Sequence, residues 1–170
     1  PVPDYEALLD QDIKGKRIAI IDNVQEAIQD KAIVESFNDL TQKLERCGAK
    51  IEHVRLTDDL LSVLLPTYFI IANAEATANH SNLDGIRYGV REDGDSVEEV
   101  MINSRTKGFS ANIRKRFVIG SYSLFVENQD KLFRKAQKVR RLIVNEVKAV
   151  LDQYDIILTT AAPTIAPHPQ

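Results

Sequence analysis

The sequence predicts an α/β fold that is rich in helix, with about three short parallel strands and long flanking helices. Residues 17–22 (RIAIID) form a short isoleucine-rich run, as strands buried on both faces do. A helical pattern over 30–47 follows, and then a second strand pattern over 50–56 (KIEHVRL). A strand, a helix and a strand in this order favour parallel pairing, so the two strands are expected in one sheet.

The boundaries of this unit can be read from the residues. The predicted helix carries one apolar stripe at spacings of four, three and four, formed by Ile33, Phe37, Leu40 and Leu44. Gly48 follows at the position where a left-handed residue ends a helix. A third strand is predicted at 155–159 (DIILT), after the longest helix, and we expect it to join the same sheet.

The middle of the chain is predicted to be helical. A helix with Pro66 in its first turn continues through Ala78, and it is so apolar that we expect burial on nearly all sides. Turn residues predict a loop over 82–94. The remaining predicted helices are 96–104, with a capping box of Ser96 and Glu99 and a break at Gly108, 111–126, and 130–154.

Composition and charge restrict the classes of function. The chain has 170 residues with 22 Lys and Arg against 25 Asp and Glu, and its net charge of −3 excludes nucleic-acid binding by bulk positive charge. Any basic site must therefore be local. One cysteine cannot form an internal disulfide, so we expect a reducing compartment such as the cytoplasm. No apolar run approaches the roughly 18 residues that span a membrane, so no membrane association is expected.

Both ends of the sequence indicate a piece of a longer chain. It begins at Pro1 without an initiator methionine and ends in a proline-rich coil over 163–170. Only 7 glycines occur among the 170 residues, about 4% against a usual value of roughly 7%. We therefore expect 1–170 to be a single partial domain, truncated at both ends.

No catalytic machinery can be recognised residue by residue. Cys47 lies at a predicted helix C-terminus, where the helix dipole opposes a thiolate, so a structural role is the better interpretation. His53, His80 and His168 lack the spacing of metal ligands. No phosphate loop, dinucleotide fingerprint or nucleophile elbow is present. We therefore predict no catalytic residue, metal site or cofactor within these residues.

Two polar residues interrupt the apolar helix of the middle segment. Tyr68 and Glu75 are seven residues apart and hence on one face. A buried phenol and carboxylate require partners and often line a polar cavity. The alternative that we favour for Glu75 is an internal ion pair with an arginine such as Arg87, which would serve packing alone.

Cationic residues gather in two places. The first group lies on predicted loops and helix starts, where a guanidinium can hold a carboxylate or phosphate by two hydrogen bonds: Arg87, Arg91, Arg105, Arg114, Lys115 and Arg116. The second is a like-charged face of the longest predicted helix: Lys131, Arg134, Lys135, Lys138 and Arg141. Such a face fits phosphates or an acidic partner, although solvated charge is its commoner meaning.

A series of motifs resembles the A subunits of tRNA-dependent glutamyl/aspartyl amidotransferases, which belong to the amidase signature family. The motifs are, in order, YFIIA at 68–72, AEA at 74–76, DGIRYG at 84–89, GFS at 108–110, KR at 115–116, GSY at 120–122, KAQKVR at 135–140, YDIILT at 154–159 and APT at 162–164. The resemblance covers nearly the whole chain in order. It implies a C-terminal portion of the amidase signature fold.

The resemblance implies a function that belongs to a larger assembly. In that family a serine nucleophile, activated by a second serine and a lysine in a Gly/Ser-rich segment, hydrolyses glutamine, and the ammonia passes to a partner protein. No such segment occurs here, so the catalytic residues are expected upstream of Pro1 and 1–170 alone is expected to be inactive. Implied partners are subunits B and C, with ATP and Mg used in one of these partners. The implied reaction converts Glu-tRNA(Gln) or Asp-tRNA(Asn) to the amidated form.

Two substrate-binding residues follow from the resemblance. By position, Tyr68 and Arg116 match the family's tyrosine and arginine that contact the bound glutamine. A phenol hydroxyl suits the amide, and a guanidinium suits the α-carboxylate. The sequence departs from the usual family pattern at EATAN (75–79), FVENQ (125–129) and TTAAP (159–163), which indicates a divergent member.

Two other hypotheses stay open at this point. The parent protein is, in the first, an amidase-signature hydrolase that acts on some other amide. In the second, the chain is a stand-alone interaction module that uses its cationic helix face.

Overall fold

A computed structural model of the protein describes residues 2–9 and 11–167. The chain forms two compact units, of which the first comprises 1–58 with 144–170 and the second comprises 59–143. The α/β class is confirmed, with the sheet in the first unit and helices in both. The single partial domain over 1–170 stays a prediction. Of the predicted C-terminal coil, 163–167 contains no helix or strand, while Pro1 and His168 to Gln170 lie outside the described residues.

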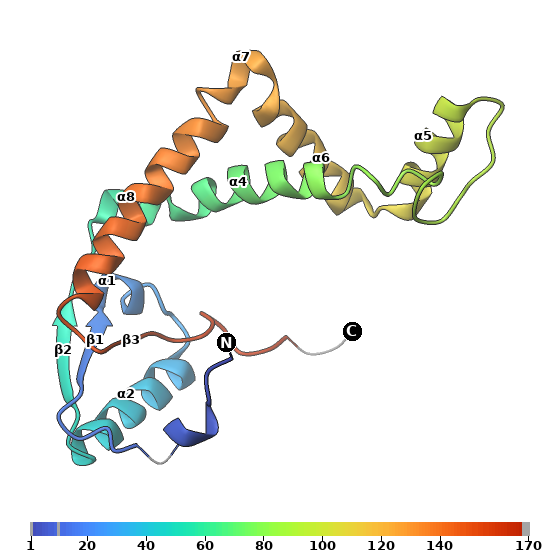
Figure 1. The fold of residues 1–170 in the computed structure, drawn as a ribbon. Coiled ribbons are helices and arrows are strands. Elements are labelled where there is room, and N and C mark those ends of the chain that lie inside the picture. The colour runs from blue at the N-terminus through green and yellow to red at the C-terminus, as the bar shows by residue number, and fades with distance from the viewer. Residues whose placement is uncertain (1, 10, 168–170) are drawn as a thin grey trace. The chain divides into compact units, whose positions relative to one another are not determined.

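The sheet of the first unit has three parallel strands, as predicted. They are β1 (Arg17–Ile21), β2 (Lys50–Val54) and β3 (Ile156–Leu158), in the order β2-β1-β3 (Figure 1). Ile18 of β1 is in register with Ile51 of β2 and with Ile156 of β3. Because β1 is paired on both edges, its apolar run forms the centre of this unit, and the exposed fraction of Ala19 is 0%.

Arg17 joins the starts of all three strands. Its Nε and Nη2 donate to the two carboxylate oxygens of Glu52 on β2, at 3.0 and 3.1 Å. Its backbone N–H donates to the Asp155 carboxylate at 2.8 Å, and the Asp155 N–H returns a bond to the Arg17 carbonyl at 2.9 Å. The guanidinium also lies 4.6 Å from the ring centre of Tyr154, whose hydroxyl donates to Glu52. One residue therefore fixes the register of strands that are far apart in sequence.

These contacts also affect the protonation of the partners. The Arg17 hydrogen bond is the main cause that lowers the pKa of Glu52, while burial is the main cause that raises the pKa of Tyr154. Glu52 therefore stays ionised and can accept a hydrogen bond. Tyr154 keeps the hydroxyl proton that it donates to Glu52.

The helix between β1 and β2 has the predicted ends. Helix α2 (Lys31–Arg46) begins after Asp30, whose side chain accepts from the N–H groups of Ala32 and Ile33. Gly48 follows it with φ of +90°, in the left-handed region. Two short elements of this unit were not predicted: the 3₁₀ turn η1 (Glu6–Leu8) and α1 (Asp22–Gln25), each too short to show an apolar period.

The helices outside the first unit differ in extent from the prediction. They are α3 (Asp58–Ser62), α4 (Leu64–Asn79), α5 (Val97–Gly108), α6 (Ala111–Leu124), α7 (Val126–Gln129) and α8 (Phe133–Leu151), the last of which continues into the first unit. Ser96 caps α5 by accepting from the Glu99 N–H at 3.2 Å, as expected, but α5 continues past Ser104 to Gly108. Phe125 has an extended ψ of 143°, which ends α6 and separates it from α7.

The expectation that α4 is buried on nearly all sides is wrong. Its buried residues are Thr67, Ile71, Asn73 and Ala74. Leu65 and Tyr68 are 57% and 55% exposed. The buried residues of α4 lie on the side that packs against other helices of the second unit. Because Thr67 and Asn73 make that side partly polar, the apolar content of the helix did not indicate which face is covered.

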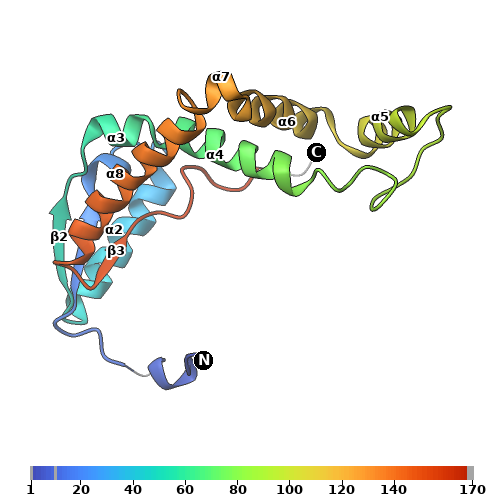
Figure 2. The same cartoon turned by 45° about the horizontal axis from the view of Figure 1, so that its top comes forward.

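Helices α4 and α6 lie side by side in both views (Figure 1 and Figure 2). Gly120 of α6 is buried, and a Cβ at this position would overlap the Asn73 carbonyl and the Thr77 hydroxyl of α4. Thr77 Oγ1 donates to the Asn73 carbonyl at 2.8 Å and approaches the Phe117 carbonyl at 3.3 Å. The two backbones therefore approach closely only because residue 120 has no side chain.

Gly120→Ala is expected to lower the stability of the second unit by about 1–3 kcal/mol, because the helices must separate to admit a methyl group. Urea unfolding followed by circular dichroism measures the change. Gly108→Ala is the matched control, since a Cβ at Gly108 meets nothing within 4 Å. Equal stabilities of the two variants would contradict the close approach at Gly120.

Candidate substrate-binding site

The loop after α4 contains a carboxylate that is almost completely buried. Asp84 is 2% exposed and accepts from the backbone N–H groups of Ile86 and Arg87, each at 2.9 Å. The Arg87 side chain adds an ion pair at 2.8 Å. The two backbone bonds, with that of Arg87 first, hold the pKa of Asp84 well below its ordinary value. Asp84 is therefore ionised, and its carboxylate holds the turn over 84–87 together.

This arrangement corrects the favoured hypothesis for Glu75. Arg87 pairs with Asp84, three residues away, and Glu75 is exposed at the surface of α4. A partner three residues along the same loop is reached without ordering a second segment, so the local carboxylate takes the guanidinium. Glu75 has no ion pair among the residues that the structure describes.

Asp84→Asn is expected to destabilise the protein at neutral pH and to change how stability depends on pH. A carboxyl group with a depressed folded-state pKa contributes stability above its unfolded pKa, about 3.9, and that contribution is lost as pH falls. Urea midpoints measured between pH 7 and pH 3 should therefore fall less in the variant than in the parent. A variant and parent with parallel pH curves would show that Asp84 is not the titrating group.

Most of the other arginines considered as anion clamps are occupied. Arg105 Nη1 donates to the carbonyls of His80 and Leu83, both at 2.9 Å, and its guanidinium lies over Phe109 and Phe117. Arg105 therefore satisfies backbone carbonyls at and just after the C-terminal end of α4. The Arg114 guanidinium donates to the Thr106 carbonyl at the end of α5. These contacts hold helix ends and engage the Nη1 group of each guanidinium within the fold.

Arg116 differs from these arginines. It is exposed on α6, and its guanidinium carbon lies 5.9 Å from the ring centre of Phe69 on α4. The Tyr68 ring centre lies 5.5 Å from that of Phe69. Within the described residues Arg116 has no ion pair with an acidic side chain. The structure thus places both predicted substrate-binding residues, Tyr68 and Arg116, next to the same aromatic ring without a direct contact between them.

Tyr68 also borders a groove of about 310 Å³ between α4 and the first part of α8. The walls are mostly apolar, and the lining residues are Leu64, Thr67, Tyr68, Ile71, Ala72, Glu75, Arg140 and Ile143. Arg140 was not predicted as a site residue. A signal was present in the sequence, because Arg140 lies four residues after the buried Ala136 and three before Ile143, on the otherwise apolar side of α8.

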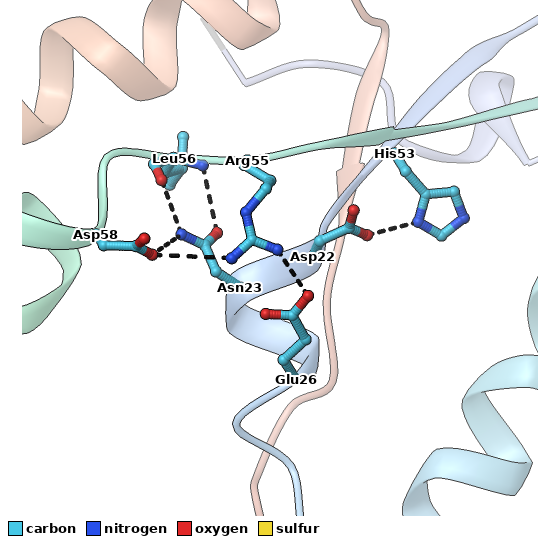
Figure 3. A network of polar contacts seen from close by, with 7 residues as sticks. All are labelled: Asp22, Asn23, Glu26, His53, Arg55, Leu56 and Asp58. Carbon is cyan, nitrogen blue, oxygen red and sulfur yellow. Dashed lines mark hydrogen bonds and ion pairs between the residues drawn. The ribbon is translucent and has the colours of Figure 1, made fainter.

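A separate polar network lies where β1 and β2 end, and Figure 3 shows its members. Asp22 and His53 approach to 2.6 Å, and Arg55 donates to Glu26 at 2.6 Å. That bond is the main cause that raises the pKa of Arg55. Asn23, in turn, bonds the Leu56 carbonyl and the Asp58 carboxylate, each at 2.7 Å.

Carboxyl ends of parallel strands are common ligand sites, but the side chains of this network mostly bind one another. They join α1 to the segment after β2, so we interpret the network as structural. Cys47 is exposed after α2 and is not part of it. Among the described residues no cluster of three potential metal ligands occurs, and no helix there is long and apolar enough to cross a membrane.

Comparison with known families identifies the family of the chain. The model of the family described as Amidase matches residues 1–170, which is the whole chain. The chain belongs to the Amidase family. The substrate-binding role of Tyr68 and Arg116 stays a prediction.

Several curated relatives of this Amidase chain share one name. The A subunit of glutamyl-tRNA(Gln) amidotransferase from Microcystis aeruginosa is 35% identical over 98% of this chain and 34% of its own length. The protein of that name from Streptococcus gordonii is 38% identical over 97% of this chain and 34% of its own length. The chain thus spans about a third of the length of these relatives.

Solved structures agree with the Amidase assignment. The crystal structure of the glutamyl-tRNA(Gln) amidotransferase A subunit from Thermotoga maritima matches 89% of this chain and 28% of its own, with a TM-score of 0.58 and 31% identity. A bacterial aryl acylamidase of the amidase signature family matches 99% of this chain and 33% of its own, with a TM-score of 0.65. At 13% identity, that second likeness shows the fold alone.

Proposed function

We propose that the chain is part of the A subunit of a tRNA-dependent amidotransferase, in which it supplies one wall of the glutamine-binding site. Curated relatives that are 35% and 38% identical over nearly all of this chain carry that name, which supports the proposal. In this proposal the parent protein hydrolyses glutamine and its ammonia amidates Glu-tRNA(Gln) or Asp-tRNA(Asn), in a cytoplasmic complex with subunits B and C. ATP and Mg would act in one of these partners, and the 170 residues alone would be inactive.

The observation that carries the proposal is the state of Arg116. Two of the neighbouring arginines, Arg105 and Arg114, are committed to carbonyl groups at helix ends. Arg116 keeps its donors available beside Phe69. A guanidinium in this state can hold the α-carboxylate of an amino acid by two parallel hydrogen bonds.

Tyr68 provides the complementary group. Its side chain is 55% exposed and borders the groove. A phenol hydroxyl both donates and accepts, so it can pair with either half of a side-chain amide. Tyr68 and Arg116 both lie near the Phe69 ring, and we propose that they bind the two ends of one small polar molecule such as glutamine.

Arg116→Ala in the full-length gene product is expected to raise the KM for glutamine about 10- to 100-fold, the cost of losing a charge-assisted pair of hydrogen bonds. The kcat should change less, because the interaction serves binding in both ground and transition states. Steady-state ammonia release measures both constants. Lys115→Ala, an exposed neighbour on α6, is the matched control. An unchanged KM in Arg116→Ala would remove Arg116 from the pocket.

A second candidate function is hydrolysis of another amide. The apolar lining of the groove beside Tyr68, with Leu64, Ile71 and Ile143, would accept an apolar substituent better than a polar one.

The full-length gene product without partner proteins or tRNA separates the two functions. Under the leading proposal, it should hydrolyse simple aryl and alkyl amides at rates close to background, and the complete complex should show glutamine-dependent amidation of charged tRNA. Rapid turnover of those amides by the lone protein would favour the second function.

A further inference from the structure

A strongly basic segment lies at the start of α8 and in the turn just before it. Residues 130–141 contain six cations and one acid, so this segment carries +5. The net charge of the whole chain is −3, and the remaining 158 residues therefore carry −8. A local basic site is the only kind that the overall charge permits, and 130–141 is one of two such segments; the other, 105–116, contains five cations and no acid, but its Arg105 and Arg114 bond backbone carbonyls.

Five of these cations share one exposed surface, which we call the α8 basic stripe: Lys131, Arg134, Lys135, Lys138 and Arg141. Arg134, Lys135, Lys138 and Arg141 lie in α8, where steps of three, four and seven residues bring side chains onto one face, and Lys131 lies in the turn just before this helix. Ala136, which is 4% exposed, and Ile143, which lines the groove, lie on the other side of the helix with Arg140. The stripe therefore faces away from the packed side of α8 and away from the groove beside Tyr68.

The stripe is poorly neutralised within the chain. Arg134 bonds Asp130 at 3.0 Å, and it is the one stripe residue with an ion pair in the part of the chain that the structure describes. Some cations elsewhere are paired with a carboxylate, as Arg17 is with Glu52, Arg55 with Glu26 and Lys107 with Glu92. Like charges three and four residues apart destabilise a helix, so the stripe carries a small cost, of which the Arg134–Asp130 pair offsets a part.

We propose that the α8 basic stripe binds the phosphate backbone of RNA. Three of its five cations are lysines, and lysine is depleted in protein–protein interfaces, whereas contacts to phosphates are made chiefly by lysine and arginine. The stripe also lacks the aromatic side chains that anchor protein partners. The inference rests on the proposed function for the identity of the RNA, a tRNA, because the relatives are named for that substrate.

The test is the salt dependence of binding of a fluorescently labelled tRNA transcript to the full-length gene product, followed by anisotropy. Neutralising Lys135, Lys138 and Arg141 together to glutamine removes three phosphate contacts. The slope of log K against log salt should fall in magnitude by about 2.7, so that about 40-fold less affinity is lost between 50 and 200 mM salt. Lys31, Lys43 and Arg46, exposed on α2, changed together to glutamine form the charge-matched control and should leave the slope unchanged.

Two further variants and probes make the result decisive. A charge-preserving variant, K135R/K138R/R141K, should keep the parental slope, which separates loss of charge from damage to the helix. Equal slopes for the neutralised and parental proteins would overturn the proposal. Displacement of tRNA by poly-glutamate as readily as by unlabelled tRNA would also overturn it and would assign the stripe to an acidic protein.

The inference and the proposed function can fail separately. The neutralised stripe variant should keep the parental KM for glutamine, because the stripe lies on the opposite side of α8 from the groove. Stripe-dependent binding of tRNA by a protein with no glutamine-dependent activity would sink the proposed function alone. Glutamine-dependent activity with tRNA binding independent of the stripe would sink this inference alone.

Discussion

The close approach of α4 and α6 at Gly120 is the constraint on which the candidate site depends. Gly120 is one helical turn after Arg116, and the atoms that it meets, in Asn73 and Thr77, are one to two turns after Phe69. The distance between the two helix axes therefore sets whether the Arg116 guanidinium reaches the Phe69 ring. A wider separation would leave Tyr68 and Arg116 on two unrelated surfaces.

The pattern of helix and strand was predictable where the information is local. The left-handed Gly48, the cap at Ser96 and the isoleucine-rich β1 each depend on residues within a few positions, and each is found. The burial of α4 was not predictable, because it depends on which elements of the second unit lie beside that helix. Phe125 ends α6 through its backbone conformation, and no glycine or proline marks the position.

The site was predictable in a more limited way. Tyr68 and Arg116 came from resemblance to a family, and neither composition nor periodicity distinguished Arg116 from Arg105 or Arg114. The structure distinguishes them, because two of the three bond carbonyls at helix ends. The predicted ion pair between Arg87 and Glu75 was wrong. Arg87 pairs instead with Asp84, three residues away. Local carboxylates compete better for a guanidinium because little chain must be ordered to reach them.

The discontinuity of the first unit has a consequence during synthesis. The Arg17 to Asp155 contact joins residues 138 positions apart, and the whole second unit is translated between β2 and β3. At rates of about 5–20 residues per second, the last strand follows β2 by roughly 5–20 s. The second unit, which is continuous in sequence, can fold during that interval. Over the same time β1 lacks its partner β3. A nascent chain of this protein therefore leaves the β3 side of β1 without its strand partner until residues 156–158 have been made, and an unpaired strand edge is prone to aggregate during that interval.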